Sequence, residues 1–159
     1  MNAPLARSTR NAVGIVLGLG WLMTVPLVPA AAQDAMATVK MPAELTVAAP
    51  AARADGYLDI AVTSFTPPRQ GAVSAVVSIV DGDGRKHEVG RFSIFPAEAF
   101  VAKTPAEART FRLDARDALA AVKAKGPLKV LVQLTPDDGA GETADSAVTI
   151  GRATFVPPP

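Results

Sequence analysis

The sequence predicts a mainly β protein, an antiparallel β-sandwich or a barrel-like relative of it, with one short α-helix. Three observations indicate this fold. Apolar and polar side chains alternate along several short segments, which is the period of a half-buried strand. Turn signals rich in proline, glycine and aspartate separate these segments at regular spacing. Only one stretch, the alanine-rich Ala115–Lys125, has the pattern of a helix.

The N-terminal region has the pattern of an export signal. Arg7 and Arg10 supply a positive start, residues 12–28 form an apolar run, and Ala30-Ala31-Ala32 supplies a small-x-small cleavage pattern. The alternative is a retained membrane anchor, but the run is shorter than the about 20 residues that span a bilayer and is broken by Pro26. We therefore predict a signal peptide at residues 1–32 and a periplasmic or secreted protein without a membrane segment after cleavage.

Residues 33–56 are predicted to form an extended leader ahead of a β-sandwich at residues 57–156, which a proline tail at residues 157–159 ends. Within the leader, Glu44–Val47 is a candidate strand between two prolines. Proline lacks the N–H that a central strand position needs, so this piece is predicted to be an edge strand or part of the extended leader.

The first two strands of the predicted domain are separated by a proline turn. From Tyr57 the apolar residues alternate with less apolar ones, and the inward positions are Leu58, Ile60 and Val62. The segment Phe65-Thr66-Pro67-Pro68 ends this strand, since proline fixes its own φ and restricts the residue before it. Ala72–Val80 is dense in valine and is predicted to be well buried.

Asp81-Gly82-Asp83-Gly84 predicts a hairpin turn, because glycine supplies the positive φ that such turns require. The returning strand is Lys86–Phe95. Its larger apolar groups predict an inner face made of Glu88, Gly90, Phe92 and Ile94. The outer face then carries His87, Val89 and Arg91.

The second half is predicted to begin with a loop or helical turn at Pro96–Pro105. A short strand follows at Thr110–Leu113, with Phe111 and Leu113 pointing inward. The helix and two final strands complete the domain. Asp114 is the predicted helix N-cap, with Asp117 near the positive end of the dipole and Gly126 as the stop. The final strands are Leu128–Leu134, with one apolar and one mixed face, and Ala147–Phe155.

Composition excludes several classes of function. The chain has no cysteine and one histidine, so thiolate metal sites, Fe–S clusters and cysteine nucleophiles are excluded. It has 16 Lys and Arg against 15 Asp and Glu, and loss of Arg7 and Arg10 with the signal leaves a slight acidic excess. A near-neutral surface with mixed charges is not typical of nucleic-acid binding.

Three candidate sites of chemistry are weak by their spacing. Asp81 and Asp83 resemble the start of a calcium-binding loop. Counted from Asp81, however, the fifth and twelfth positions of such a loop are Arg85 and Phe92, which do not supply the ligands it needs, so a plain turn is favoured. The second carboxylate pair, Asp137 and Asp138, also lies in a glycine turn. Copper ligation by His87, Met36 and Met41 lacks ligands, and a surface histidine with leader methionines is favoured. A serine hydrolase is not indicated, because Ser74, Ser78 and Ser93 lie in strands without a nucleophile elbow.

Four segments together carry a resemblance to a known domain: YLDIAVTSFTPP, VGRFSIF, FRLDARDAL and AVTIGRATF. In this order, over residues 57–155, they resemble the C-terminal β-domain of tyrosinases and polyphenol oxidases. The resemblance implies a β-sandwich that packs over the active site of a dicopper oxidase. A dicopper site needs about six imidazole ligands. The only histidine of this chain is His87, so the copper belongs to a partner.

The sequence therefore predicts an exported, non-catalytic β-domain that associates with, shields or scaffolds a tyrosinase-like dicopper oxidase in trans. It predicts no cofactor of its own and no nucleic-acid partner. Phe65, Pro67 and Phe95 are the candidate partner contacts, because both phenylalanines end strands beside prolines; the alternative for the aromatics is that they cover the core. Two other functions stay open, a structural or adhesion-type sandwich and a small copper carrier.

Overall fold

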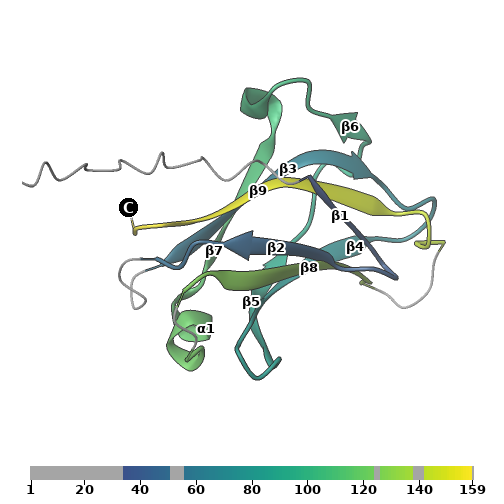
Figure 1. The fold of residues 1–159 in the computed structure, drawn as a ribbon. Helices are drawn as coiled ribbons and strands as arrows, with labels where there is room; N and C mark the ends of the chain where they lie inside the picture. Colours follow the sequence, from purple (N-terminus) through teal and green to yellow (C-terminus); the bar gives the residue numbers. More distant parts are fainter. Residues whose placement is uncertain (1–33, 51–55, 124–125, 138–141, 159) are drawn as a thin grey trace, which may run out of the picture. The chain divides into compact units, whose positions relative to one another are not determined.

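The computed structural model describes residues 34–50, 56–123, 126–137 and 142–158. In this part of the chain two antiparallel sheets face each other across one core, and a short helix lies at one end of them (Figure 1). The predicted β-sandwich with one short α-helix is therefore confirmed. The predicted signal segment, residues 1–32, lies outside the described residues.

The first sheet has five strands in the order β1-β9-β3-β6, with β7 also paired to β3. Two strands share one side of β3: β7 pairs with its first part, from Tyr57 to Val62, and β6 pairs with Ser64 and Phe65. The bounds of the strands are β1 Ala35–Thr38, β3 Tyr57–Thr66, β6 Phe100–Val101, β7 Arg109–Asp114 and β9 Ala147–Val156.

The second sheet has four strands in the order β2-β8-β4-β5. Edge strand β2 pairs with β8, and β4 forms a hairpin with β5 that closes at the Asp81–Gly84 turn. The bounds of the strands are β2 Ala43–Val47, β4 Val73–Val80, β5 Lys86–Phe92 and β8 Leu128–Pro136.

The segment expected to be a leader supplies an edge strand to each sheet. Strand β1 pairs with β9 in the first sheet, and β2 pairs with β8 in the second, at the edge that Pro42 predicts. The chain crosses between the sheets in a turn where the Thr38 hydroxyl accepts hydrogen bonds from the amides of Lys40 and Met41. The sandwich thus includes strands on the N-terminal side of Tyr57.

The core lies between the sheets and follows the predicted alternation. Leu58, Ile60 and Val62 are fully buried, and β4 buries every second residue from Val73 to Ile79. At one edge of the sandwich the rings of Phe92 and Phe111 stack with centroids 4.2 Å apart and join β5 to β7. The inward positions of Phe111 and Leu113 are also confirmed, since both pack against the core.

The predicted faces of β5 are wrong in its first half. Ile79 pairs with His87 and Val77 pairs with Gly90, but Ser78 pairs with Glu88, so Val89 is an extra residue at a β-bulge. One extra residue moves every following side chain to the opposite face. His87 therefore lies on the inner face and is partly buried, whereas Glu88 is exposed; Phe92 and Ile94 are buried as predicted.

The helix is shorter than predicted and begins one residue later. Helix α1 spans Arg116–Ala121 with Ala115 at the N-cap, and the chain leaves it at Val122, well before Gly126. Asp114 is not the cap residue, but its carboxylate accepts the first helical amide, that of Arg116, at 3.1 Å and also binds the Arg116 guanidinium. The expected end at Lys125 lies outside the described residues.

Beside α1, the described residues contain a single-turn 3-10 helix, η2, at Pro105–Glu107. It begins at Pro105, the last residue of the predicted loop or helical turn Pro96–Pro105, and ends before β7. None of the helices in the described part of the chain is long and apolar enough to cross a membrane.

Candidate functional site

The three predicted contact residues differ in exposure. The side chain of Phe65 is only 4% exposed and belongs to the core, so the prediction of a partner contact is corrected at this position. The reason is a bulge in β3: the pairing with β9 shifts between Val62 and Ser64, which places Phe65 on the inner face. Pro67 is half-buried, and Phe95 is 91% exposed.

Pro67 and Phe95 lie at the same end of the sandwich. Phe65, at the end of β3, pairs with Phe100 of β6, which places Pro67 beside the residues that precede Phe100. Those residues, 93–99, link β5 of one sheet to β6 of the other. Two of the three predicted contacts are thus on adjacent loops, and we name this region, residues 67–72 and 93–99, the loop end.

Asp81 has a structural role in the hairpin turn. Its Oδ1 accepts the amides of Asp83 and Arg85, each at 2.9 Å, and its Oδ2 accepts a hydrogen bond from Nε2 of His87 at 3.0 Å. Both carboxylate oxygens are therefore used by donors of the chain itself. This arrangement matches the plain turn that the sequence favours over a calcium loop, and Asp138 lies outside the described residues.

The Asp81 contacts predict an effect of pH on stability. The hydrogen bond from His87, followed by those from the amides of Arg85 and Asp83, lowers the pKa of Asp81 below its ordinary value of 3.8. Because the pKa is lowered in the folded state, this stabilisation is present above pH about 4 and is lost as the pH falls through the folded-state pKa. We expect the Asp81→Asn variant to lose stability less steeply than the wild type between pH 5 and pH 2.

Urea unfolding at a series of pH values would measure this slope. Asp83→Asn is the matched control, because Asp83 is exposed and its carboxylate makes no hydrogen bond among the described residues. Equal slopes for Asp81→Asn and the wild type would show that the Asp81 carboxylate is not held by these donors.

The structure does not bring the copper-carrier residues together. Met36 is on β1, at the edge of the first sheet beside β2, and Met41 is in the turn that follows. His87 is on β5, the opposite edge strand of the second sheet, and its Nε2 is bonded to Asp81. Ser74 and Ser93 hydrogen-bond to each other at 3.0 Å on the outer side of that sheet, away from His87.

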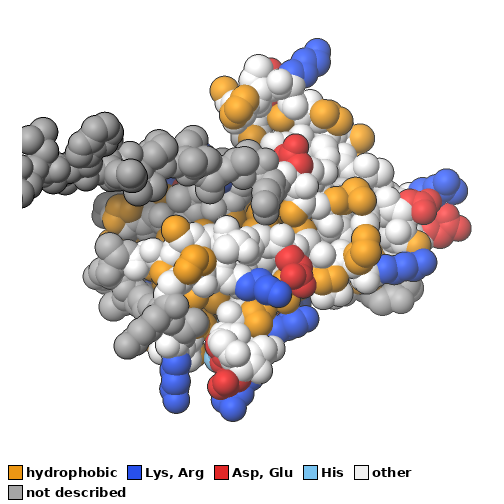
Figure 2. Space-filling model, viewed as in Figure 1, with side chains coloured by type: hydrophobic (Ala, Val, Ile, Leu, Met, Phe, Trp, Pro, Cys, Tyr) orange, Lys and Arg blue, Asp and Glu red, His pale blue; other side chains and the backbone are white. Residues whose placement is uncertain are grey.

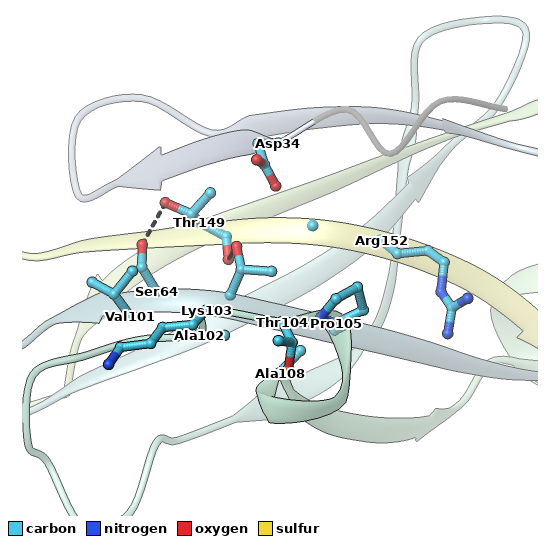
Figure 3. A pocket seen from close by; sticks show the side chains of 13 residues that line it. Asp34, Ser64, Val101, Ala102, Lys103, Thr104, Pro105, Ala108, Thr149 and Arg152 are labelled. Atoms are coloured by element: carbon cyan, nitrogen blue, oxygen red, sulfur yellow. Dashed lines mark hydrogen bonds between the residues drawn. The ribbon is translucent and has the colours of Figure 1, made fainter.

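A groove that the sequence did not predict lies on the outer face of the first sheet (Figure 3). Its volume is about 560 Å³. Strands β3 and β9 form the floor, and the segment from β6 to η2 forms one wall. The floor carries three hydroxyl groups, from Thr63, Ser64 and Thr149, and the Ser64 hydroxyl donates to Thr149 Oγ1 at 2.7 Å.

A double irregularity between β3 and β9 shapes the floor. Ala61 pairs with Arg152, Val62 with Ile150, and Ser64 with Thr149, so that Gly151 and Thr63 are both left without a partner. Gly151 lets the Thr63 side chain pack directly on the backbone of β9: a Cβ there would lie 2.5 Å from Cγ2 of Thr63 and 3.4 Å from Oδ1 of Asp34. Bulges are common beside functional sites because they redirect side chains.

The wall of the groove is fixed by its own hydrogen bonds. The Ala102 amide donates to the carbonyl of the bulged Thr63 at 2.7 Å. Glu107 then accepts from the Lys103 amide at 2.9 Å and from the Thr104 hydroxyl at 3.3 Å. Thr104 and Glu107 have the spacing of a capping box, but the Thr104 side chain caps no helical amide; the Glu107 carboxylate instead joins η2 to the preceding turn through these two bonds.

The charges around the groove are unequal in number. Lys103 and Arg152 lie at opposite ends of the groove, and Asp34 lies above the floor (Figure 3). None of these three side chains forms an ion pair with another described residue. The nearby carboxylate of Asp59 is already bound by Arg112 through two hydrogen bonds of 2.7 and 2.9 Å, which lower its pKa.

The side chain of Arg109, the first residue of β7, is a further cation and lies beside β6. Its guanidinium lies 4.1 Å from the ring centroid of Phe100, a cation–π contact, and its buried Nη1 has no hydrogen-bond partner among the described residues. Elsewhere the charges are mixed: Figure 2 shows positive and negative side chains interspersed on the face that it presents.

Sequence patterns could have indicated only part of the groove. The T-x-x-E spacing from Thr104 to Glu107 is a recognisable capping signal. The floor depends on the register of two strands that are far apart in the sequence, and no local pattern reveals a bulge of that kind.

Comparisons with known proteins do not identify the chain. No known family matches it, and no curated protein matches it. Two virus structures show a low similarity. The structure of the infectious bursal disease virus Gx strain has 11% identity and a TM-score of 0.33, over 76% of this chain and 28% of that chain. The Gt strain structure has 9% identity and a TM-score of 0.29, over 76% and 32%.

This chain thus spans no more than about a third of the viral chains. Similarity at this level carries no argument about function. Neither structure is of a tyrosinase or a polyphenol oxidase, so the resemblance drawn from the four sequence segments stays a prediction.

Proposed function

We propose that this chain is a non-catalytic protein-binding β-sandwich that is exported from the cell and docks on its partner through the loop end. The exposure of Phe95 carries this proposal. Its side chain is 91% exposed, whereas the side chain of its neighbour Ile94 is 7% exposed. A phenyl group in water forgoes the free energy of burial, and a partner surface recovers it.

Residues on and beside the loop end support a binding role for it. Pro67 lies on the adjacent loop, and Val101 of β6 is 76% exposed. The Arg109 guanidinium lies over the ring of Phe100, the other residue of β6, and its buried Nη1 has no hydrogen-bond partner among the described residues. Aromatic residues and arginine are the residue types that protein interfaces favour at their centres.

A tyrosinase-like dicopper oxidase is the partner that we propose. The four-segment resemblance supports it, together with the order of the elements from β7 through α1 and β8 to β9, which is the order that the resemblance implies. Among the described residues, no cluster of three or more His, Cys, Asp or Glu side chains is placed to hold a metal ion. In this proposal the copper is bound by the partner, and the β-sandwich contacts the partner's surface.

Site-specific photo-crosslinking in the native host tests this proposal. A photoreactive phenylalanine analogue replaces Phe95 in the full-length chain, and cross-linked adducts are identified by mass spectrometry. We expect an adduct with a dicopper protein. Because Phe95 is almost fully exposed, the replacement should change the free energy of unfolding by no more than about 0.5 kcal/mol.

The same analogue at Lys86 is the control, since Lys86 is an exposed position of the second sheet at the other end of the molecule. An adduct at Phe95 with a protein that lacks copper would overturn the proposed partner. Equal yields at the two positions, or no adduct at Phe95, would overturn docking through the loop end.

A further inference from the structure

We infer that the groove on the first sheet binds an extended acidic segment of a partner protein, with its acidic side chains at Lys103 and Arg152. The inference rests on the proposed protein-binding function, because it assigns a chemical character to part of the partner. It concerns a different surface from the loop end, and the two can therefore be tested separately.

The size and shape of the groove fit an extended chain. Its volume of about 560 Å³ is within the usual range of binding sites. The two cations lie at opposite ends, with Thr63, Ser64 and Thr149 on the floor between them (Figure 3). In an extended peptide alternate side chains point the same way, so one set faces the floor. Because Ala61 and Gly151 form part of that floor, small side chains fit there.

The floor can satisfy the backbone of such a segment. The Thr149 hydroxyl oxygen accepts from Ser64, which leaves the Thr149 hydroxyl hydrogen free to donate to a peptide carbonyl. The Asp34 carboxylate, which has no ion-pair partner among the described residues, can accept a peptide N–H. Both kinds of backbone polar group therefore have a counterpart in the groove.

Charge complementarity favours an acidic occupant over a basic one. Two cations, Lys103 and Arg152, and one carboxylate, Asp34, line the groove, while the Glu107 carboxylate in the wall already accepts from the Lys103 amide and the Thr104 hydroxyl. The charge of Asp59, the next acid along the sheet, is already compensated by Arg112 at 2.7 Å. Like charges across an interface are strongly unfavourable, so a basic segment would be rejected at both ends.

The groove is also continuous with the loop end. Val101 lines the groove, and Phe100, the other residue of β6, directly follows residues 93–99. A partner seated on Phe95 could therefore extend a segment along β6 into the groove without crossing the rest of the surface.

Fluorescence anisotropy with a labelled glutamate-alanine-alanine-alanine-glutamate peptide tests the inference on the folded, signal-cleaved chain. We expect a dissociation constant of about 1 mM or tighter. We expect binding of the matched lysine-alanine-alanine-alanine-lysine peptide to be at least about tenfold weaker. Added salt should weaken binding of the acidic peptide, since both contacts are between exposed charges.

Charge reversal identifies the residues. The double variant Lys103→Glu with Arg152→Glu should weaken binding of the acidic peptide at least about tenfold, while Lys86→Glu on the second sheet should change it less than about twofold. Circular dichroism of each variant confirms that it is folded. Equal binding of both peptides, or equal loss with Lys86→Glu, would overturn the inference.

The outcomes separate the two proposals. Peptide binding without cross-linking at Phe95 would retain the acidic-segment site and reject docking through the loop end. Cross-linking at Phe95 without peptide binding would do the reverse. A concentration-dependent dimer that disappears with the double variant would show that a second copy of this chain occupies the groove, and would overturn an acidic partner segment.

Discussion

Replacement of Leu119 by alanine is expected to lower the free energy of unfolding by about 2–5 kcal/mol. Leu119 is 1% exposed and is the largest side chain with which α1 reaches the core. It lies directly against Gly56, where a Cβ would be only 2.7 Å from Leu119 Cδ1. A helix of this length does not persist on its own, so its docking depends on this contact.

Urea unfolding followed by fluorescence or circular dichroism would measure the loss. Ala120→Gly is the control, because Ala120 is exposed on the same helix and its replacement costs only the helix propensity, about 1 kcal/mol. Limited proteolysis would detect whether residues 116–121 become accessible in Leu119→Ala. Equal destabilisation by the two variants would mean that α1 contributes little packing to the core.

Replacement of Gly151 by alanine is expected to destabilise the protein by about 1–3 kcal/mol, because the new methyl group overpacks the groove floor. The added Cβ would lie 2.5 Å from Cγ2 of Thr63, far inside van der Waals contact, and Thr63 is β-branched and stiff at χ1. Either the strands separate or Thr63 changes its rotamer. Both responses alter the floor.

A second substitution tests this cause directly. Thr63→Ser removes Cγ2 and keeps the hydroxyl, so the double variant Gly151→Ala with Thr63→Ser should regain most of the lost stability. Gly82→Ala is the control, since nothing lies within 4 Å of a Cβ at Gly82. If the double variant is no more stable than Gly151→Ala alone, the close approach to Thr63 is not the reason for glycine at this position.

The element types could be predicted because each leaves a local pattern. The alternation of Leu58, Ile60 and Val62 and the apolar face of β8 are properties of single segments, and burial follows the period of two that a strand imposes. The glycines that follow Asp81 likewise indicate the hairpin turn from the local sequence alone. The predictions were wrong where a shift of one residue matters. The extra residue Val89 changed the faces of β5, and α1 began one residue later than the predicted cap at Asp114 implies.

The exposure of the candidate contact residues could not be predicted from local sequence. Phe65 and Phe95 have similar sequence surroundings, each predicted at the end of a strand with a proline within two residues, yet one is 4% and the other 91% exposed. Phe65 lies in β3, where the shifted pairing with β9 turns its side chain to the inner face, whereas β5 ends at Phe92 and leaves Phe95 in the link to β6. A bulge is decided by the partner strand, so local sequence does not reveal it.

The sequence by itself determined the mainly β fold, the single short helix, the hairpin turn at Asp81–Gly84 and the alternation that builds the core, since these follow from periodicity and turn chemistry. The tertiary structure alone decided that the side chain of Phe95 is exposed and that of Phe65 is buried. It also decided that Thr63, Gly151, Lys103 and Arg152 form one groove. These arrangements depend on the register between strands distant in sequence, which is fixed only when both sheets pack around the core.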